Sequence, residues 1–334
     1  VVQYPLNQGV GFNAIVDVLK MTMYKFPDAG GKPEKLPIPE EEKAKAEDLH
    51  RILVEAVAVN DETLMEHYLD KGELDEDEMR IGLKKSLINH DLFPVFCLSA
   101  TRDMGSGRIM GFIDNVCPSA NEMPPQKTRT GGELTCEDAG PTCIFVYKTM
   151  SEPHVGELSF FKVFSGVIKA GMELVNENTG SSEKINQLFV VEGNKRTPVN
   201  ELTAGDIGAT LKLKNTHVNN TLHDKGKNIE LLPIEFPAAN LTMAIETTKK
   251  GEEEKLSIAL HELRHEDPTL RVEVSPELKQ TLIHSMGDMH LAVAKWKIEH
   301  LQKIEVKFKR PRIAYRETIR RSADSMYRHK KQSG

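Results

Sequence analysis

The order of strand-type and helix-type patterns within residues 240–310 constrains the fold more than any other feature of this 334-residue chain. The run NLTMAIETT alternates apolar and polar residues, as a strand with one buried face does. The run GEEEKLSIALHELRHEDP repeats apolar residues at helical spacing, with glutamates at its start and basic residues and a proline at its end. Two strands (LRVEV and QTLIH), a helix from Met289 and a last strand (IEVKF) follow. The order βαββαβ predicts a ferredoxin-like sandwich over residues 236–310.

The segment HSMGDMHLAV in this region concentrates side chains that could bind a metal or act in catalysis. We expect His284 to end a strand and His290 to lie in the following helix, where neither has a histidine four residues away on the same face. Ser285 is expected to be the N-cap of that helix, with Asp288 closing a capping box. The prediction for this segment is a structural role.

The helix that follows is predicted to have one buried and one exposed face. Its expected core stripe consists of Leu291, Ala294, Ile298 and Leu301. Trp296, the only tryptophan, precedes Ile298 by two positions and therefore lies about 200° away around the helix axis. We expect the indole to point away from the sheet and to pack against a neighbouring domain, with stacking on an RNA base as the alternative.

Residues 142–235 contain strand patterns alone. CIFVYKT, GELSFFKVFSG, MELVN, KINQLFVV and DIGATLKL are β-type runs separated by turns rich in Gly, Asn and Lys. Strands at this spacing with no helix between them predict a small β-barrel. The preceding residues, 121–141, are rich in Pro, Gly, Thr and Glu without an apolar period, which favours a linker.

Residues 1–120 have a mixed α/β pattern. Residues 39–71 place leucines and valines at helical intervals, and Gly72 is expected to stop that helical stretch. A second helix is predicted over residues 75–89. The run FPVFCLSA then predicts a short buried strand, and GSGRIMGFIDNVCPS predicts another helix.

Charge is distributed unevenly, although the formal net charge is only −6. Residues 34–91 contain 17 acidic and 8 basic side chains, whereas residues 295–334 contain 13 basic and 4 acidic ones. The acidic segment suits a basic protein surface and the basic segment suits a polyanion. Both patterns also occur on ordinary solvated faces, so charge alone does not identify a partner.

The last segment, residues 311–334, begins by alternating arginines with apolar residues. A strand here would have an apolar side that one strand cannot bury alone, so we expect the start of a further domain, mobile or paired with another molecule. Its basic side would suit phosphates. The candidate nucleic-acid contacts are Arg312, Arg316, Arg320, Arg321, Lys330 and Lys331.

The cysteines and the start of the chain indicate the compartment. Cys97, Cys117, Cys136 and Cys143 form no CxxC pair and complete no zinc pattern, so we interpret them as reduced structural residues. No apolar run is long enough for a membrane span, and VVQYPLNQ is not a signal peptide. The missing initiator Met suggests a piece of a longer protein. We expect a cytoplasmic monomer with no membrane contact.

Several of these runs, in this order, resemble bacterial elongation factor G. DETLMEHYL and LFPVFCLSA are similar to the insert and final strand of its GTPase domain, and EPHVGELSFFKVFSGVIKAGMELVN is similar to its second domain. EKLSIALHELRHEDPTLRVEV and MGDMHLAV are similar to its third domain, and AYRETI and KKQSG to the start of its fourth. Departures at motif positions, such as Leu98 for a Gly and Trp296-Lys297 for an Asp-Arg pair, indicate a divergent paralogue.

The resemblance implies a multidomain α/β and α+β protein. Residues 1–120 would be the end of a GTPase domain with its helical insert, and residues 311–334 the start of a fourth domain. The full-length factor would move messenger and transfer RNA through the ribosome, with ribosomal RNA, a small-subunit protein and the stalk protein as partners. Ser99 and Ala100 would lie beside the guanine base. A factor that recycles or protects ribosomes has the same domain plan and is the alternative.

Most of the chemistry of such a GTPase has no counterpart in this sequence. Phosphoryl transfer needs a glycine-rich loop with a Lys around the phosphates and a Ser or Thr on Mg²⁺. The sequence has no GxxxxGK[ST] and no NKxD, and GGKPEK has the wrong spacing. We therefore expect this chain to be inactive alone and to bind no GTP, with GTP and Mg²⁺ as cofactors only of an intact parent. An unrelated hydrolase is the other enzyme class, but no catalytic spacing supports it.

Overall fold

The computed structural model describes residues 1–152 and 156–330. Contacts divide the chain into two compact units, each considered by itself below. Unit 1 comprises Val1–Gln126 with Thr135–Glu137, and unit 2 comprises Lys127–Leu134 with Asp138–Gly334. Within the described ranges, none of the helices has the length and apolar character that crossing a membrane requires.

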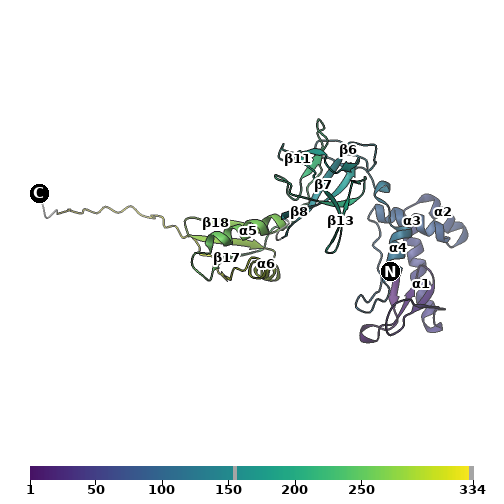
Figure 1. Cartoon of the computed structure of the whole chain (residues 1–334). Helices are drawn as coiled ribbons and strands as arrows, with labels where there is room; N and C mark the ends of the chain where they lie inside the picture. Colours follow the sequence, from purple (N-terminus) through teal and green to yellow (C-terminus); the bar gives the residue numbers. More distant parts are fainter. Residues whose placement is uncertain (153–155, 331–334) are drawn as a thin grey trace. The chain divides into compact units, whose positions relative to one another are not determined.

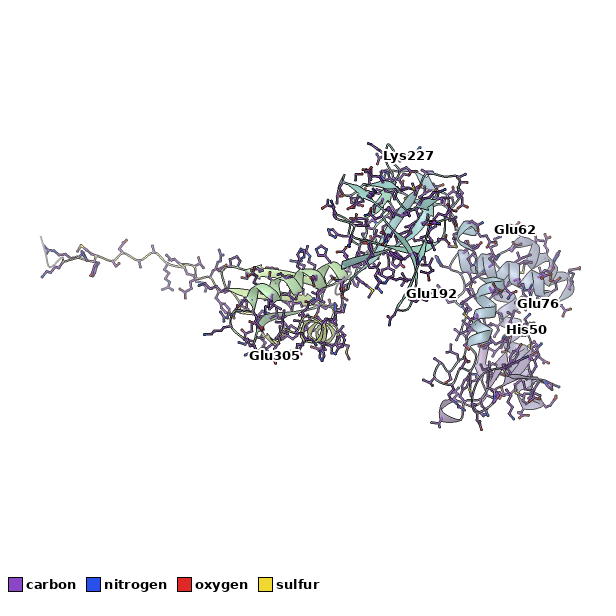
Figure 2. The ribbon with its side chains drawn as sticks, viewed as in Figure 1. His50, Glu62, Glu76, Glu192, Lys227 and Glu305 are labelled. Carbon is purple, nitrogen blue, oxygen red and sulfur yellow. The ribbon has the colours of Figure 1, made fainter. Side chains whose placement is uncertain are left out.

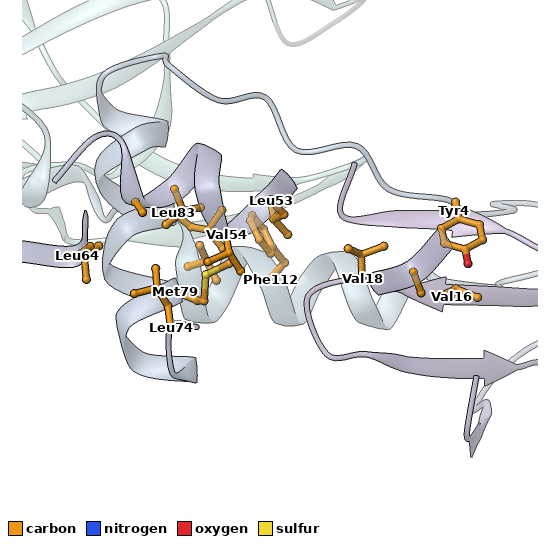
Figure 3. Packing of buried hydrophobic residues seen from close by; sticks show 14 of the residues in the cluster. Tyr4, Val16, Val18, Leu53, Val54, Leu64, Leu74, Met79, Leu83 and Phe112 are labelled. Carbon is orange, nitrogen blue, oxygen red and sulfur yellow. The ribbon is translucent and has the colours of Figure 1, made fainter. Parts of the chain in front are cut away.

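Unit 1 combines a four-stranded antiparallel sheet with four helices (Figure 1). The strands are β1 (Gln3–Pro5), β2 (Ala14–Asp17), β3 (Thr22–Lys25) and β4 (Glu34–Leu36), paired in sequence order. The helices are α1 (Glu40–Ala58), α2 (Glu62–Lys71), α3 (Glu76–Ile88) and α4 (Ser106–Val116). Short 3₁₀ turns occur at Gly9–Gly11 and Ala120–Glu122. Leu53 and Val54 of α1, Leu83 of α3 and Phe112 of α4 belong to the core that joins the helices (Figure 3).

The helical stretch predicted over residues 39–71 is two helices. Asp61 begins α2 as its N-cap, with its carboxylate accepting hydrogen bonds from the backbone N–H groups of Thr63 at 2.9 Å and Leu64 at 3.2 Å. Aspartate favours this role because its short side chain reaches the backbone donors that a helix start leaves unsatisfied. Gly72 ends α2 in the left-handed conformation, at φ 79°, as predicted.

The strand predicted for FPVFCLSA is not formed. The carbonyl of Val95 accepts hydrogen bonds from the backbone N–H groups of Val2 and Gln3, both at 3.1 Å, but no continuous ladder develops along these residues. Ser99 forms only an isolated bridge with Met104. The predicted burial is absent as well, since Phe93 is 76% and Val95 53% exposed. The prediction was wrong because an apolar run alone supplies neither a covering layer nor the partner in register that a strand needs.

The larger part of unit 2 is an eight-stranded antiparallel sheet in the order β11-β10-β16-β7-β8-β15-β12-β13. Its strands are β7 (Cys143–Glu152), β8 (Gly156–Ser165), β10 (Glu173–Asn176), β11 (Ser182–Lys184), β12 (Leu188–Glu192), β13 (Lys195–Val199), β15 (Ile207–Leu211) and β16 (Thr221–His223). Two smaller pairs join β9 (Ile168–Lys169) to β14 (Glu201–Leu202), and β5 (Gln126–Lys127) to β6 (Glu133–Leu134). Side chains from strands at both ends of the order share one core, including Leu174, Phe161 and Leu188. We call this part the barrel.

The end strand β13 carries features that limit further pairing. Lys195 and Arg196 begin this strand, and Pro198 lies inside it. A proline has no N–H group to donate to a neighbouring strand, which is why prolines in sheets are confined to edges and bulges. Part of the interpreted linker packs elsewhere on the barrel, because Leu134 is buried in a cluster with Phe145 of β7.

The remaining part of unit 2, which we call the third module, has the predicted βαββαβ order. Its elements are β17 (Leu241–Thr247), α5 (Glu253–Glu266), β18 (Arg271–Ser275), β19 (Gln280–Ser285), α6 (Asp288–His300) and β20 (Val306–Lys309). The antiparallel sheet has the order β18-β19-β17-β20. This is the strand order of a ferredoxin-like sandwich, so the predicted fold of this module is confirmed. The two helices and the sheet enclose one core, to which Ile245 and Ile283 belong.

The capping box predicted for α6 is absent, because β19 extends to Ser285. The N-cap is Gly287, and the Ser285 hydroxyl is buried with the Gly287 carbonyl as its contact at 3.3 Å. The ring of His290 acts near this helix start instead. Its Nδ1 accepts from the Met286 N–H at 3.1 Å, and its Nε2 lies 2.8 Å from the Asp267 carboxylate. The side-chain acceptor for a backbone N–H at this helix start is thus the ring of His290 and not the predicted pair Ser285 and Asp288.

Most of the residues predicted for the buried face of α6 are buried. Leu291, Ala294 and Ile298 are buried, whereas Leu301 is 56% exposed. Leu301 was expected in the core but follows the last helical residue, where the chain turns away. Trp296 points outward as predicted, with 53% of its surface exposed and its ring stacked on His300 at 5.0 Å.

Candidate functional surfaces

The loop that contains Ser99 and Ala100 is a tight connection in unit 1. The backbone N–H of Ser99 donates to the Met104 carbonyl at 2.9 Å, and the Met104 N–H donates back to Ser99 at 3.0 Å. Arg102 ties the loop to the segment before β2 by donating to the Phe12 carbonyl at 3.0 Å. Ala100 itself is exposed. The loop is thus held by backbone and side-chain hydrogen bonds, and the small side chain of Ala100 is accessible at its start.

A buried ion pair fixes α4 directly after this loop. Asp17 at the end of β2 is 1% exposed and accepts hydrogen bonds from Arg108 of α4, from Nη2 at 2.6 Å and Nε at 3.1 Å. The same carboxylate also accepts from the Gln3 amide at 3.1 Å and the Lys20 backbone N–H at 2.9 Å. Two donors from a planar guanidinium give the pair a defined geometry. The pair therefore sets the orientation of α4 against the sheet.

Charged side chains cover the helical part of unit 1, with Glu62 on α2 and Glu76 on α3 among them (Figure 2). Many acidic groups here already have basic neighbours. The Arg80 guanidinium lies 2.6 Å from Glu76, and Lys20 also bonds to Glu76 and holds the pKa of that carboxyl below its usual value. The predicted acidic surface is therefore partly neutralised on α3.

The predicted C-terminal basic residues do not form one patch. Arg312 stays with the third module, where its backbone N–H donates to the Gln280 side chain at 2.9 Å and its guanidinium donates to the Leu278 carbonyl at 3.3 Å. The Arg316 guanidinium lies 3.4 Å from Glu277. Arg320, Arg321 and Lys330 are exposed, in a segment with no regular secondary structure over residues 311–330. Lys331 lies outside the described residues.

A basic groove in the third module was not predicted as a site. It has a volume of about 770 Å³, and basic residues from several elements line it, among them Lys249, Lys250, Arg264, Lys307, Lys309 and Arg312. Glu246 also lines the groove and bonds to Lys309, which lowers the pKa of the carboxyl. The exposed lysines that alternate along IEVKFK were a usable signal, because alternate residues of a strand share one face.

The barrel and the third module meet at the end of β7, within unit 2. The Thr149 hydroxyl donates to the His265 carbonyl at 2.6 Å, and the Ser151 N–H donates to the Glu266 carboxylate at 2.8 Å. Lys297 of α6 donates to the other oxygen of Glu266, also at 2.8 Å. Three histidines lie beside these contacts. The spacing of His261 and His265, four residues apart on one helix, is a signal in the sequence that could have found them.

The side chains that could bind a metal ion are those of His, Cys, Asp and Glu, and the cysteines could also react as thiols. Over residues 1–152 and 156–330, no group of three or more His, Cys, Asp or Glu side chains is arranged to hold a metal ion. The four cysteines are free thiols, and burial raises the pKa of the Cys143 thiol to about 12. Such a thiol is inert at neutral pH.

Comparison with known proteins assigns both parts of unit 2. Residues 141–225 match the family model of elongation factor G domain 2, and residues 236–310 match that of elongation factor G domain III. A crystal structure of a protein from Thermus thermophilus superposes with a TM-score of 0.75 at 24% identity, over 93% of this chain and 45% of that chain. At this identity the likeness shows the fold, and the chain spans less than half of that protein's length. The second and third domains of elongation factor G thus occur in tandem in this chain, over residues 141–225 and 236–310.

Proposed function

We propose that this chain is a ribosome-binding part of a translation factor which, as an intact protein, promotes the movement of tRNA and mRNA. The observation that carries the proposal is the tandem match to domains II and III of elongation factor G. The basic groove of the third module and the arginines after it offer charge complementary to ribosomal RNA. In this proposal, the barrel and third module meet small-subunit RNA and protein, and the helices of unit 1 meet the stalk protein. The protein would act as a cytoplasmic monomer.

Ribosome binding by this chain is expected to be strong at low salt and to weaken steeply as salt is added. Each contact between a basic side chain and a phosphate releases counterions, so the logarithm of the affinity falls with the logarithm of the salt concentration. Co-sedimentation with ribosomes over a salt series measures this slope. Changing Arg312, Arg316, Arg320 and Arg321 to Gln should reduce the slope by roughly 3.

The matched control changes exposed basic residues of unit 1, Lys43→Gln and Arg51→Gln, which already pair with acidic neighbours on α1. These variants should bind as the unchanged chain does. Absence of any association at low salt would contradict the proposal, and an equal loss in both sets of variants would contradict the assignment of the C-terminal arginines.

Ser99 and Ala100 are proposed to lie beside guanine only when a complete GTPase domain supplies the other loops. This chain alone should therefore show no saturable binding when a fluorescent GTP analogue is titrated against it. The physical reason is that a triphosphate needs a cradle of backbone N–H groups, a lysine and Mg²⁺, and one loop leaves most of its charge uncompensated. An affinity in the micromolar range would contradict this prediction.

Recycling or protection of ribosomes is the alternative function, because factors of that kind share these domains. A translocation assay with the intact parent protein separates the two. Movement of tRNA and mRNA in that assay supports the first function, whereas ribosome splitting or release of a bound inhibitor without movement supports the second.

A further inference from the structure

Three imidazole rings gather where the barrel meets the third module. His217 lies in the loop between β15 and β16, and His261 and His265 lie one turn apart on α5. The ring centroids of His217 and His265 are 4.5 Å apart, and those of His261 and His265 are 4.4 Å apart. The Nε2 atoms of His261 and His265 are separated by only 3.2 Å. Two positively charged imidazolium rings at this distance would repel each other. At most one ring of the pair can therefore take up an additional proton without an electrostatic cost.

We propose that this joint is a proton-sensitive contact, which stays closed while His217 and His265 are neutral and opens when they become protonated. The rings line a cavity of about 440 Å³, and His217 and His261 are exposed, so protons reach the cluster without unfolding. The proposal does not depend on ribosome binding. Imidazole rings change charge near neutral pH, so the proton is a ligand that this cluster can take.

Charged groups surround the cluster from every element packed against it. They are Glu157 of β8, Glu183 of β11, Lys214 in the loop after β15, Arg264, Glu262 and Glu266 of α5, and Lys297 of α6. Two of these carboxylates already accept hydrogen bonds, and burial and the charge of His261 lower the pKa of His217 more than the charge of Glu183 raises it. Glu266 accepts from Lys297 and from the Ser151 N–H, and Glu183 accepts from the backbone N–H groups of Lys214 and Asn215.

The direction of the pH effect follows from these surroundings. Partial burial, followed by the charge of His261, lowers the pKa of His217. Partial burial, followed by the charges of His217 and His261, lowers the pKa of His265. An open joint returns both rings to water and to an ordinary pKa of about 6.5, so the open form binds more protons. Closure is therefore fully favoured above about pH 6.5 and is lost as the pH falls below it.

Glu157 acts in the opposite direction. Its burial and the neighbouring charge of Glu266 raise the pKa of its carboxyl, so a protonated Glu157 favours closure. This contribution grows as acid protonates the carboxyl, below the range in which free imidazoles titrate. A Glu157→Gln variant is neutral at every pH, as protonated Glu157 is, so it should favour closure throughout and make opening on acidification less complete.

The distance between the barrel and the third module tests the proposal. Spin labels on unnatural amino acids at exposed Lys195 and Ala292 report it by pulsed electron paramagnetic resonance in the whole chain, with chelator present, and leave the native cysteines untouched. We expect one narrow distance at about pH 7.5 and a shift of the main population to other distances at about pH 5.5. The triple variant His217→Gln, His261→Gln and His265→Gln should keep the narrow distance at both values.

A His300→Gln variant is the matched control, because His300 is exposed on α6 and stacks on Trp296 outside the cluster. It should respond to acid as the unchanged chain does. A constant distance in the unchanged chain, or an equal response in the triple variant, would overturn the proposal. Should the triple variant not fold, an NMR titration of the unchanged chain decides, since a His217 or His265 pKa at or above about 6.5 overturns it as well.

Discussion

Replacing Phe161 with Ala is expected to lower the free energy of unfolding of the barrel by about 3–5 kcal/mol. Phe161 lies in β8, has no exposed surface and belongs to the barrel core. It pairs across the sheet with Gly208 of β15, where a Cβ would collide with Cδ1 of Leu202 and lie 3.3 Å from the Phe161 ring. Gly208 has no side chain that could turn into the space left by the ring, so we expect a cavity to remain.

Hydrogen exchange of the β8 amides, followed by mass spectrometry, measures this loss within the barrel alone. Phe160→Ala is the matched control, because the neighbouring ring is only partly buried and has the Lys148 ammonium 5.5 Å from its centroid on the other face of the strand. The Phe160→Ala variant should lower the free energy of unfolding by well under half as much as Phe161→Ala does. Equal losses in the two variants would contradict the described packing of β8.

Replacing Arg108 with Met is expected to destabilise unit 1 by about 3–5 kcal/mol. The methionine keeps much of the apolar stem but leaves the carboxylate of Asp17, at 1% exposed, without its charged partner. The bonds from Gln3 and from the Lys20 N–H remain, and they compensate only part of a buried negative charge. Exchange of the amides of β2 and α4 is the measurement.

Two further variants separate this effect from a general loss of charge. Arg80→Met removes an exposed guanidinium that pairs with Glu76 and Asp77 on α3, and it should cost less than about 1 kcal/mol. Adding Asp17→Asn to Arg108→Met removes the unpaired charge and should restore part of the lost stability. If Arg108→Met and Arg80→Met behaved alike, the buried pair would not hold α4 in place.

The third module could be predicted from the sequence because each element there has one clear period. Leu241, Met243 and Ile245 alternate, and all three pack against the core of the module. The start of α6 could not be placed in the same way. Ser285 has the right chemistry for an N-cap, but the ladder with β17 continues through it, and only pairing across the sheet reveals this.

The basic groove and the histidine joint show why sites are harder to predict than elements. Lys309 and Lys249 come from distant strands and turns, and only the fold brings them to one groove. His261 and His265 could be recognised as neighbours because they are four residues apart on one helix. His217 comes from the barrel, and its contact with His265 cannot be predicted from the sequence around either residue. Ser99 and Ala100 were assigned through a family resemblance, and their role beside guanine stays a prediction.

The proline in β13 has a consequence for crowded solutions. An incoming copy that tried to extend the sheet at this border would face the cationic Lys195 and Arg196 and would find no amide hydrogen at Pro198. Intermolecular strand addition is the first step of many aggregation reactions. The barrel can thus keep an unclosed sheet border and still resist growing into fibres from that side.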